Sequence, residues 1–382
     1  MTPDEPDMVN PMQDMGLIQD KQALIEPQGF LVPCNAARLL CERYIPDGGR
    51  LYDLIDRYDN IASYVLNRDN TAHNADVMRM VAPFLRAFGA TDLAVRRFYD
   101  SYLPAARGAT ETADHLISIM PTYVNTCMYE HAAYAMCEKL DIPLGQVSST
   151  SLDLDGAPMT ARGAAAVREM AKDICDIELP AMKYEFGVPL ELGADEVAMI
   201  SRMDEIFLHR FPVTPAEDMV RSMDSVDSNQ KAYTLIDIRK TSRVDLDGTV
   251  YIGGEAIDYQ VMDLVRDGNG LSLSFNGTEF AVRGANVAAI TEDCTVAAVL
   301  AAEFYDTGIQ GVFDLVEHWD RKHLEGDNIP DRPLVDAMLR NHPKKLPTVV
   351  RVTRDNAAEV AEKSDAYRRR MLARHAWTNM QR

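Results

Sequence analysis

Hydrophobic positions along the 382-residue chain follow two periodicities, one typical of buried strands and the other of helices. Apolar residues at helical spacing occur, for example, at 110–119 and 129–140. They alternate with strand-like runs at 23–25, 122–126, 251–253, 271–275 and 287–290. Because strands that alternate with helices are typical of βαβ units, we predict an α/β fold with a doubly wound, mainly parallel, Rossmann-like sheet.

Two helix-rich stretches interrupt this pattern and predict insertions into the sheet domain. Apolar residues recur at helical spacing throughout 35–103, which predicts a helical cap. Residues 148–210 contain one predicted strand, at 151–154, followed by helical sequence, so we expect a second, α/β insertion. The remaining units are a disordered N-terminus at 1–20, the core at 21–34, 104–147 and 211–295, and a helical C-terminal extension at 296–382.

The charge of the chain limits its partners. Its formal net charge is -20, which argues against non-specific binding to nucleic acid, since that requires clustered lysine and arginine. The one basic concentration is a set of arginines near the C-terminus that fits either a solvated helix end or a docking site: Arg368, Arg369, Arg370 and Arg374.

Cysteine spacing and the N-terminus indicate the compartment. The six cysteines include no Cys-x-x-Cys pair, so neither a zinc knuckle nor an iron–sulfur cluster is predicted. The chain starts without a basic segment followed by an apolar run, and no stretch reaches the roughly 18 apolar residues of a membrane span. We expect a cytoplasmic protein without membrane insertion.

A glycine-rich acidic turn follows the strand at 251–253. It reads Gly253-Gly254-Glu255-Ala-Ile-Asp258, and such turns at the carboxyl ends of strands are where α/β sheets place cations and phosphates. It resembles motif IV of the haloacid dehalogenase-like (HAD) phosphohydrolases, Gly-Asp-Ser-x-x-Asp. The resemblance implies that Asp258 is a Mg²⁺ ligand, while Gly254 replaces the other acid and Glu255 stands beside it.

Two further residues fit the phosphate-binding groups of that family. Thr126 ends a strand before a helix, where a hydroxyl and neighbouring amides hold a phosphate, although a helix N-cap explains the threonine alone equally well. Lys231 opens a helix before the acidic turn, where it fits either the family's lysine or a solvated side chain.

The first motif resembles a narrower group. Glu26-Pro-Gln28-Gly29, followed by Asn35-Ala36, is similar to the opening motif of archaeal HAD-like proteins known as the R subunit of energy-converting hydrogenase A, found chiefly in methanogens. The resemblance implies that Glu26 stands at the position of the nucleophile and of a metal ligand, and Gln28 at that of the general acid/base. A glutamate moves the attacking oxygen by about 1.5 Å, and glutamine cannot carry a proton.

Three other residues have simpler explanations. Asp245 and Asp153 each begin an Asp-x-Asp-Gly sequence like a HAD first motif, but Asp-Gly turns at strand edges account for both. Asp245 also lacks the other required groups downstream. His131, after the second motif, reads as a surface or capping residue.

These features favour a HAD-like protein with a degraded phosphohydrolase site. We expect it to bind a small phosphorylated ligand or a protein partner in an accessory role, with Mg²⁺ bound weakly or not at all. The alternative is a Mg²⁺-dependent phosphomonoesterase that uses Glu26 as nucleophile or Glu255 as a metal ligand. We also expect that Glu26→Asp with Gln28→Glu would not restore turnover, and that adding Gly254→Asp would recover it.

Overall fold

The computed structural model describes residues 19–65, 76–156, 158–178, 193–326 and 331–380. Within them a seven-stranded sheet has the order β3-β2-β1-β4-β5-β6-β7, parallel except for the antiparallel pairing of β7 with β6. The strands are β1 (Gln22–Ile25), β2 (Thr122–Tyr129), β3 (Val147–Thr150), β4 (Thr249–Gly253), β5 (Leu271–Phe275), β6 (Val287–Ile290) and β7 (Thr348–Arg351). The predicted doubly wound α/β sheet is therefore confirmed.

Alternate side chains of the central strands enter two separate cores. On β1, Leu24 packs with Leu235 and Val261 on one face, whereas Ala23 and Ile25 belong to the larger core on the other. The first face is covered by α11 (Ser228–Ser242), α12 (Tyr259–Asp267) and α13 (Glu279–Gly284), and the second by α6 (Ala109–Ile119) and α14 (Thr295–Glu317). Helix α7 (Glu130–Lys139) follows β2. Because the central strands run parallel, their carboxyl ends lie at a common edge of the sheet, where the candidate site lies.

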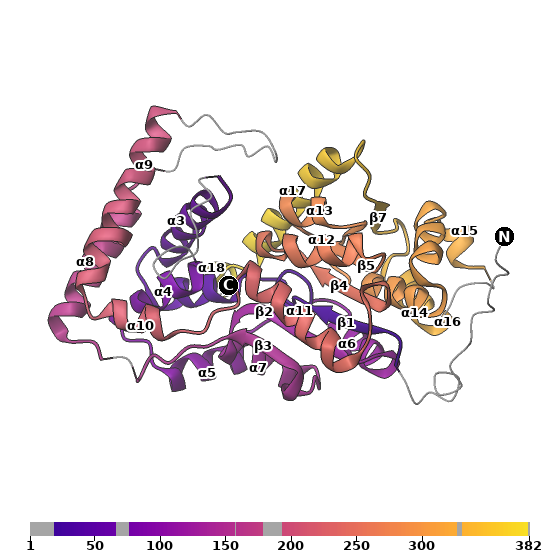
Figure 1. Cartoon of the computed structure of the whole chain (residues 1–382), viewed down its shortest axis with the longest axis horizontal. Coiled ribbons are helices and arrows are strands. Elements are labelled where there is room, and N and C mark those ends of the chain that lie inside the picture. The colour runs from indigo at the N-terminus through magenta and orange to yellow at the C-terminus, as the bar shows by residue number, and fades with distance from the viewer. Residues whose placement is uncertain (1–18, 66–75, 157, 179–192, 327–330, 381–382) are drawn as a thin grey trace, which may run out of the picture.

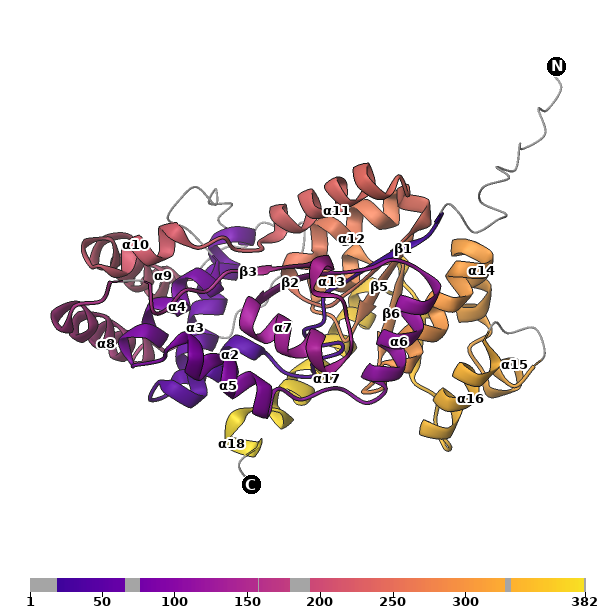
Figure 2. The ribbon, with the colours of Figure 1, turned by 90° about the horizontal axis from the view of Figure 1, so that it is seen from below.

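Helices from two distant stretches pack together at one end of the molecule (Figures 1 and 2). Tyr58 stacks on Phe207 with ring centroids 5.6 Å apart, and Phe84 lies 5.9 Å from Phe211. The first stretch comprises α2 (Ala36–Tyr44), α3 (Gly48–Asn60), η1 (Ile61–Val65), α4 (Val77–Ala87) and α5 (Asp92–Tyr102). The second comprises α8 (Ala161–Cys175), α9 (Ala194–Asp204), η3 (Glu205–Arg210), η4 (Phe211–Val213) and α10 (Ala216–Ser222).

The C-terminal part returns to the sheet. Helix α17 (Ala357–Arg374) packs Val360 and Ala361 against Ala288 of β6, and α18 (Trp377–Met380) contacts α2. The other described elements are α15 (Arg321–Leu324), α16 (Arg332–Asn341), η2 (Leu144–Gln146), η5 (Leu246–Gly248) and η6 (Ala256–Asp258).

Two strand predictions need correction. The strand expected at 151–154 lies at Val147–Thr150 and joins the edge of the central sheet. The prediction missed its position because Ser148 and Ser149 of this half-exposed strand give only a weak hydrophobic signal. The extension predicted as helical contains β7, a four-residue strand too short for its periodicity to be distinctive.

Two other expectations concern the N-terminus and membrane insertion. The predicted disorder at 1–20 falls almost entirely outside the described residues. Within the described part of the chain, no helix combines the length and apolarity needed to cross a membrane.

Candidate functional site

The site is built around Glu26, which follows directly after β1 at the carboxyl edge of the sheet. Its side chain is fully buried, and its carboxylate accepts four hydrogen bonds. The donors are Gln28 N at 3.0 Å, Thr126 Oγ1 at 2.6 Å, Cys127 N at 3.0 Å and Lys231 Nζ at 2.6 Å. Burial raises the pKa of the Glu26 carboxyl, and Lys231 opposes this shift. Four donors surround the group, so we assign it as a carboxylate at neutral pH.

Lys231 links the two acids of the site. Its Nζ lies 2.6 Å from both Glu26 Oε2 and Asp258 Oδ1, and 3.1 Å from the carbonyl oxygen of Asn125. The side chain is completely buried, so the alternative of a solvated lysine is wrong. Burial alone would lower the pKa of Lys231, but the Asp258 and Glu26 carboxylates raise it well above the usual value.

Asp258 accepts hydrogen bonds from the backbone of its own acidic turn. Its Oδ1 accepts hydrogen bonds from Lys231 and from the Tyr251 hydroxyl, the latter at 2.8 Å. Its Oδ2 accepts from the backbone N–H groups of Gly254 and Glu255, both at 2.8 Å. Both carboxylate oxygens are therefore engaged by protein donors.

Glu255 pairs with an arginine from the C-terminal helix. Arg368 of α17 bonds to Glu255 Oε1, and Gln28 Nε2 donates to the same oxygen at 2.9 Å. Gln28 also accepts from Ala36 N at 3.0 Å, so it joins the start of α2 to the site. Arg368 is 4% exposed, and a solvated helix end therefore does not describe it. We call Glu26, Lys231, Asp258, Glu255 and Arg368 the buried ion-pair network. All of these charged residues except Glu255 are buried, and Gln28 connects the two groups of ion pairs through its bonds to Glu26 and Glu255.

The carboxylates at this site do not fit the Mg²⁺ site implied by the resemblance. Each predicted ligand, Glu26, Asp258 and Glu255, is bonded to a lysine or an arginine. Among the described residues, no group of three histidine, cysteine, aspartate or glutamate side chains is arranged to hold a metal ion. Hard cations require several oxygen ligands, which this arrangement does not offer.

Position 254 also cannot receive an acid without rearrangement. A Cβ atom added at Gly254 would lie 2.6 Å from the carbonyl oxygen of Phe275 and 3.3 Å from Arg368 Nη1. The carbonyl belongs to the backbone and does not move easily. Our expectation that a Gly254→Asp change would complete a metal site and recover turnover is therefore inconsistent with this geometry.

Helix α3 carries an acid close to the network. The pKa of Asp56 is raised to about 7 by burial, with further contributions from Glu255 and Asp53, while Arg368 opposes the shift. The fold therefore favours the protonated form of Asp56. Its contribution to stability is complete below the unfolded pKa, about 3.9, and is lost as pH rises through the folded value, about 7.

We therefore expect Asp56→Asn to remove a decrease in stability between about pH 4 and 7. At pH 8 the variant should exceed the unmodified protein by about 1 kcal/mol or more in free energy of unfolding, measured by urea titration across pH. Asp100→Asn, at an exposed acid on α5, is the control. Parallel pH curves for the unmodified protein and Asp56→Asn would contradict the assignment.

The remaining sequence candidates lie outside the network. Asp245 is exposed and pairs with Arg239 at 2.6 Å, and Asp153 accepts from the N–H of Gly156 in an Asp-Gly turn. His131 is buried rather than at the surface, and burial lowers its pKa. All six cysteines are free thiols.

Sequence reasoning missed the role of Arg368. The buried residues of α17 are Val360, Ala361, Ser364, Arg368 and Met371, which recur at helical spacing along one face. Ser364 is itself fully buried and donates to Gly277 O at 2.7 Å. The signal was thus a polar residue aligned with an apolar helical stripe, which grouping Arg368 with its arginine neighbours concealed.

Comparisons with known proteins find structures with a similar fold but no related sequence family. No protein-family model matches the sequence, and no curated protein does. A solved structure of gene product AF1437 from Archaeoglobus fulgidus is similar over 93% of this chain and 97% of its own, with a TM-score of 0.71 and 18% identity. At this identity the similarity shows a shared fold.

Structures of phosphoserine phosphatase are also similar, to a smaller extent. A phospho-aspartyl intermediate analogue matches 74% of this chain and 98% of its own at 13% identity and a TM-score of 0.44. An apo form matches 72% and 96% at 13% identity and a TM-score of 0.43. We draw no functional conclusion from similarities of this extent.

Proposed function

We propose that this chain is a HAD-like protein whose phosphohydrolase site is closed by its own side chains, and that it acts as a binding or accessory protein. One observation carries the proposal. The hydroxyl of Thr126, the N–H of Cys127 and the ammonium group of Lys231, which would hold a phosphoryl group, all bind the carboxylate of Glu26. Glu26 therefore occupies the position that a substrate phosphate would need.

The charge balance supports the same conclusion. In aspartyl-phosphate chemistry a cation offsets the charges of the nucleophile and the phosphate. Here Lys231 and Arg368 already pair with the three acids of the network, and Gln28 supplies no proton. The resemblance to the hydrogenase-associated archaeal proteins supports an accessory role in methanogen energy metabolism. The alternative is a Mg²⁺-dependent phosphomonoesterase acting on a small phosphorylated metabolite.

An activity assay separates these functions. With p-nitrophenyl phosphate and Mg²⁺, we expect turnover by the unmodified protein near background, because each missing electrostatic partner costs on the order of 3 kcal/mol in the barrier, a hundredfold or more in rate. Glu26→Ala and Asp245→Ala should give the same background.

Two results of this assay would overturn the proposal. Mg²⁺-dependent turnover that is lost in Glu26→Ala would establish the phosphomonoesterase. Turnover lost in Asp245→Ala and retained in Glu26→Ala would instead place the active site at the exposed Asp-Gly turn.

A further inference from the structure

The two C-terminal helices connect the sheet to the helices that follow β1. On the sheet side, Val360 of α17 packs against Ala288 of β6, and the hydroxyl of Ser364 donates to Gly277 O at 2.7 Å. At the other end, α18 contacts α2. Figure 2 shows these two yellow helices leading from the sheet to α2 and α5. We call α17 and α18 the clasp, and α2 to α5 the cap helices.

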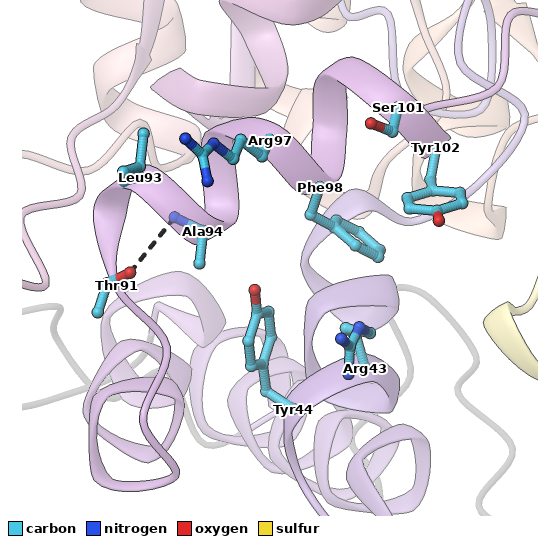
Figure 3. A pocket seen from close by; sticks show the side chains of 9 residues that line it. All are labelled: Arg43, Tyr44, Thr91, Leu93, Ala94, Arg97, Phe98, Ser101 and Tyr102. Carbon is cyan, nitrogen blue, oxygen red and sulfur yellow. Dashed lines mark hydrogen bonds between the residues drawn. The ribbon is translucent and has the colours of Figure 1, made fainter.

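One tryptophan attaches the clasp to the cap helices. Trp377 of α18 is 8% exposed, and its ring centroid lies 5.1 Å from that of Phe98 and 5.0 Å from that of Tyr102. Its backbone N–H also donates to Glu42 Oε2 at 2.6 Å. Phe98 and Tyr102 project from the same end of α5 (Figure 3), and Glu42 belongs to α2. This attachment therefore holds α2 and α5 together. Tyr102 is 50% exposed, so the attachment lies at the molecular surface.

A buried arginine of the clasp lies at the junction between the acidic turn and α3. Arg368 pairs with Glu255 of the turn. Besides burial, the charge of Glu255 raises the pKa of Asp56 on α3, and the charge of Arg368 opposes this shift. The two acids therefore repel each other across the junction, and Arg368 offsets the repulsion. Without this arginine, the charges at the junction favour the separation of α3 from the acidic turn.

We propose that the clasp holds the cap helices closed over the buried ion-pair network, and that its release opens the site. Helix α17 is fixed to the sheet, Trp377 is fixed to the cap helices, and Arg368 neutralises the junction between them. Loss of the Trp377 attachment leaves the cap helices free to move away from the acidic turn. The proposal does not depend on phosphate binding or turnover, because it concerns only the closure of the site.

Thiol labelling of the full-length protein measures this closure. Cys127 follows Thr126 in the site and is buried, so a maleimide reaches it only when the structure opens locally, at a rate proportional to the open population. Cys294, fully buried in the core before α14, reports more extensive unfolding. Mass spectrometry follows each cysteine separately. We expect Trp377→Ala to accelerate the labelling of Cys127 by about tenfold or more and to leave the rate at Cys294 unchanged.

A second variant tests the same attachment from α5. Because Tyr102 is half-exposed, Tyr102→Ala leaves the core intact, and it should accelerate the labelling of Cys127 by about threefold or more. Leu93→Ala is the matched control, since Leu93 is also exposed but lies at the opposite end of α5 (Figure 3). It should change the labelling rate of neither Cys127 nor Cys294.

Two results would overturn the proposal. In the first, neither Trp377→Ala nor Tyr102→Ala accelerates the labelling of Cys127 more than Leu93→Ala does. In the second, labelling of Cys294 is accelerated by the same factor as that of Cys127, which would show global unfolding instead of release of the cap helices. If Trp377→Ala does not fold, the comparison of Tyr102→Ala with Leu93→Ala decides the question alone.

Discussion

Replacing Lys231 by methionine is expected to lower the free energy of unfolding by about 3–5 kcal/mol, because it leaves buried acids without their cation. Lys231 is fully buried between Glu26 and Asp258, with both nitrogen–oxygen distances at 2.6 Å. Methionine keeps most of the volume and removes the charge, so the loss reports the uncompensated carboxylates rather than a cavity. Urea titration at neutral pH measures the difference.

The same helix offers a matched control. Lys240 is largely exposed and pairs with Asp237 at 2.8 Å, so Lys240→Met should cost less than about 1 kcal/mol. Because the pKa of Lys231 is raised on folding, its contribution is complete below about pH 10.4 and is lost as pH rises through the folded value. The unmodified protein should therefore lose stability above that pH more steeply than Lys231→Met. A loss below about 1 kcal/mol for Lys231→Met would contradict the buried network.

Much of the sheet could be predicted from the sequence because its central strands are buried on both faces. The runs around Leu24, at 271–275 and at 287–290 contain almost only apolar or small residues, as expected for strands covered on both faces. The edge strands gave weaker signals. Val147–Thr150 is half-exposed and rich in serine, and Thr348–Arg351 exposes both of its ends.

The candidate site was only partly accessible to sequence reasoning. Glu26 follows β1, and Lys231 and Asp258 lie at the starts of helices, as the sequence predicts. Thr126 lies within β2, which continues three residues beyond it, and its hydroxyl still reaches Glu26. Spacing along the chain does not reveal whether a glutamate one methylene longer than aspartate extends into the site or folds back onto its neighbours. The four hydrogen bonds that Glu26 accepts are a property of the assembled strand ends.

The partner of Glu255 was beyond sequence reasoning for a different reason. Arg368 comes from the C-terminal helix, and its approach depends on the docking of α17 against α13 and β6. The apolar stripe of α17 indicates that Arg368 is buried, but its pairing with Glu255 required the tertiary arrangement.

Removing the Glu26 carboxylate is expected to create a phosphate site. Glu26→Ala would leave the Thr126 hydroxyl, the Cys127 N–H and the Lys231 ammonium group without their acceptor. Buried donors without acceptors lower the free energy of unfolding, so the variant should be less stable than the unmodified protein. It should also bind an anion with several acceptor oxygens at the vacated position. Inorganic phosphate should then raise its melting temperature in proportion to the logarithm of concentration, as expected for a ligand that binds only the folded state.

The most direct measurement is the melting temperature of the unmodified protein, Glu26→Ala and Glu26→Gln across a phosphate series, with chloride at matched ionic strength as the reference. Glu26→Gln keeps a side chain of the same length in place and serves as the control. If Glu26 is the internal occupant of the phosphate position, phosphate will stabilise Glu26→Ala alone and leave the other two proteins unchanged. Stabilisation of the unmodified protein by phosphate that Glu26→Ala abolishes would contradict this account and establish an open site in which Glu26 supports the ligand.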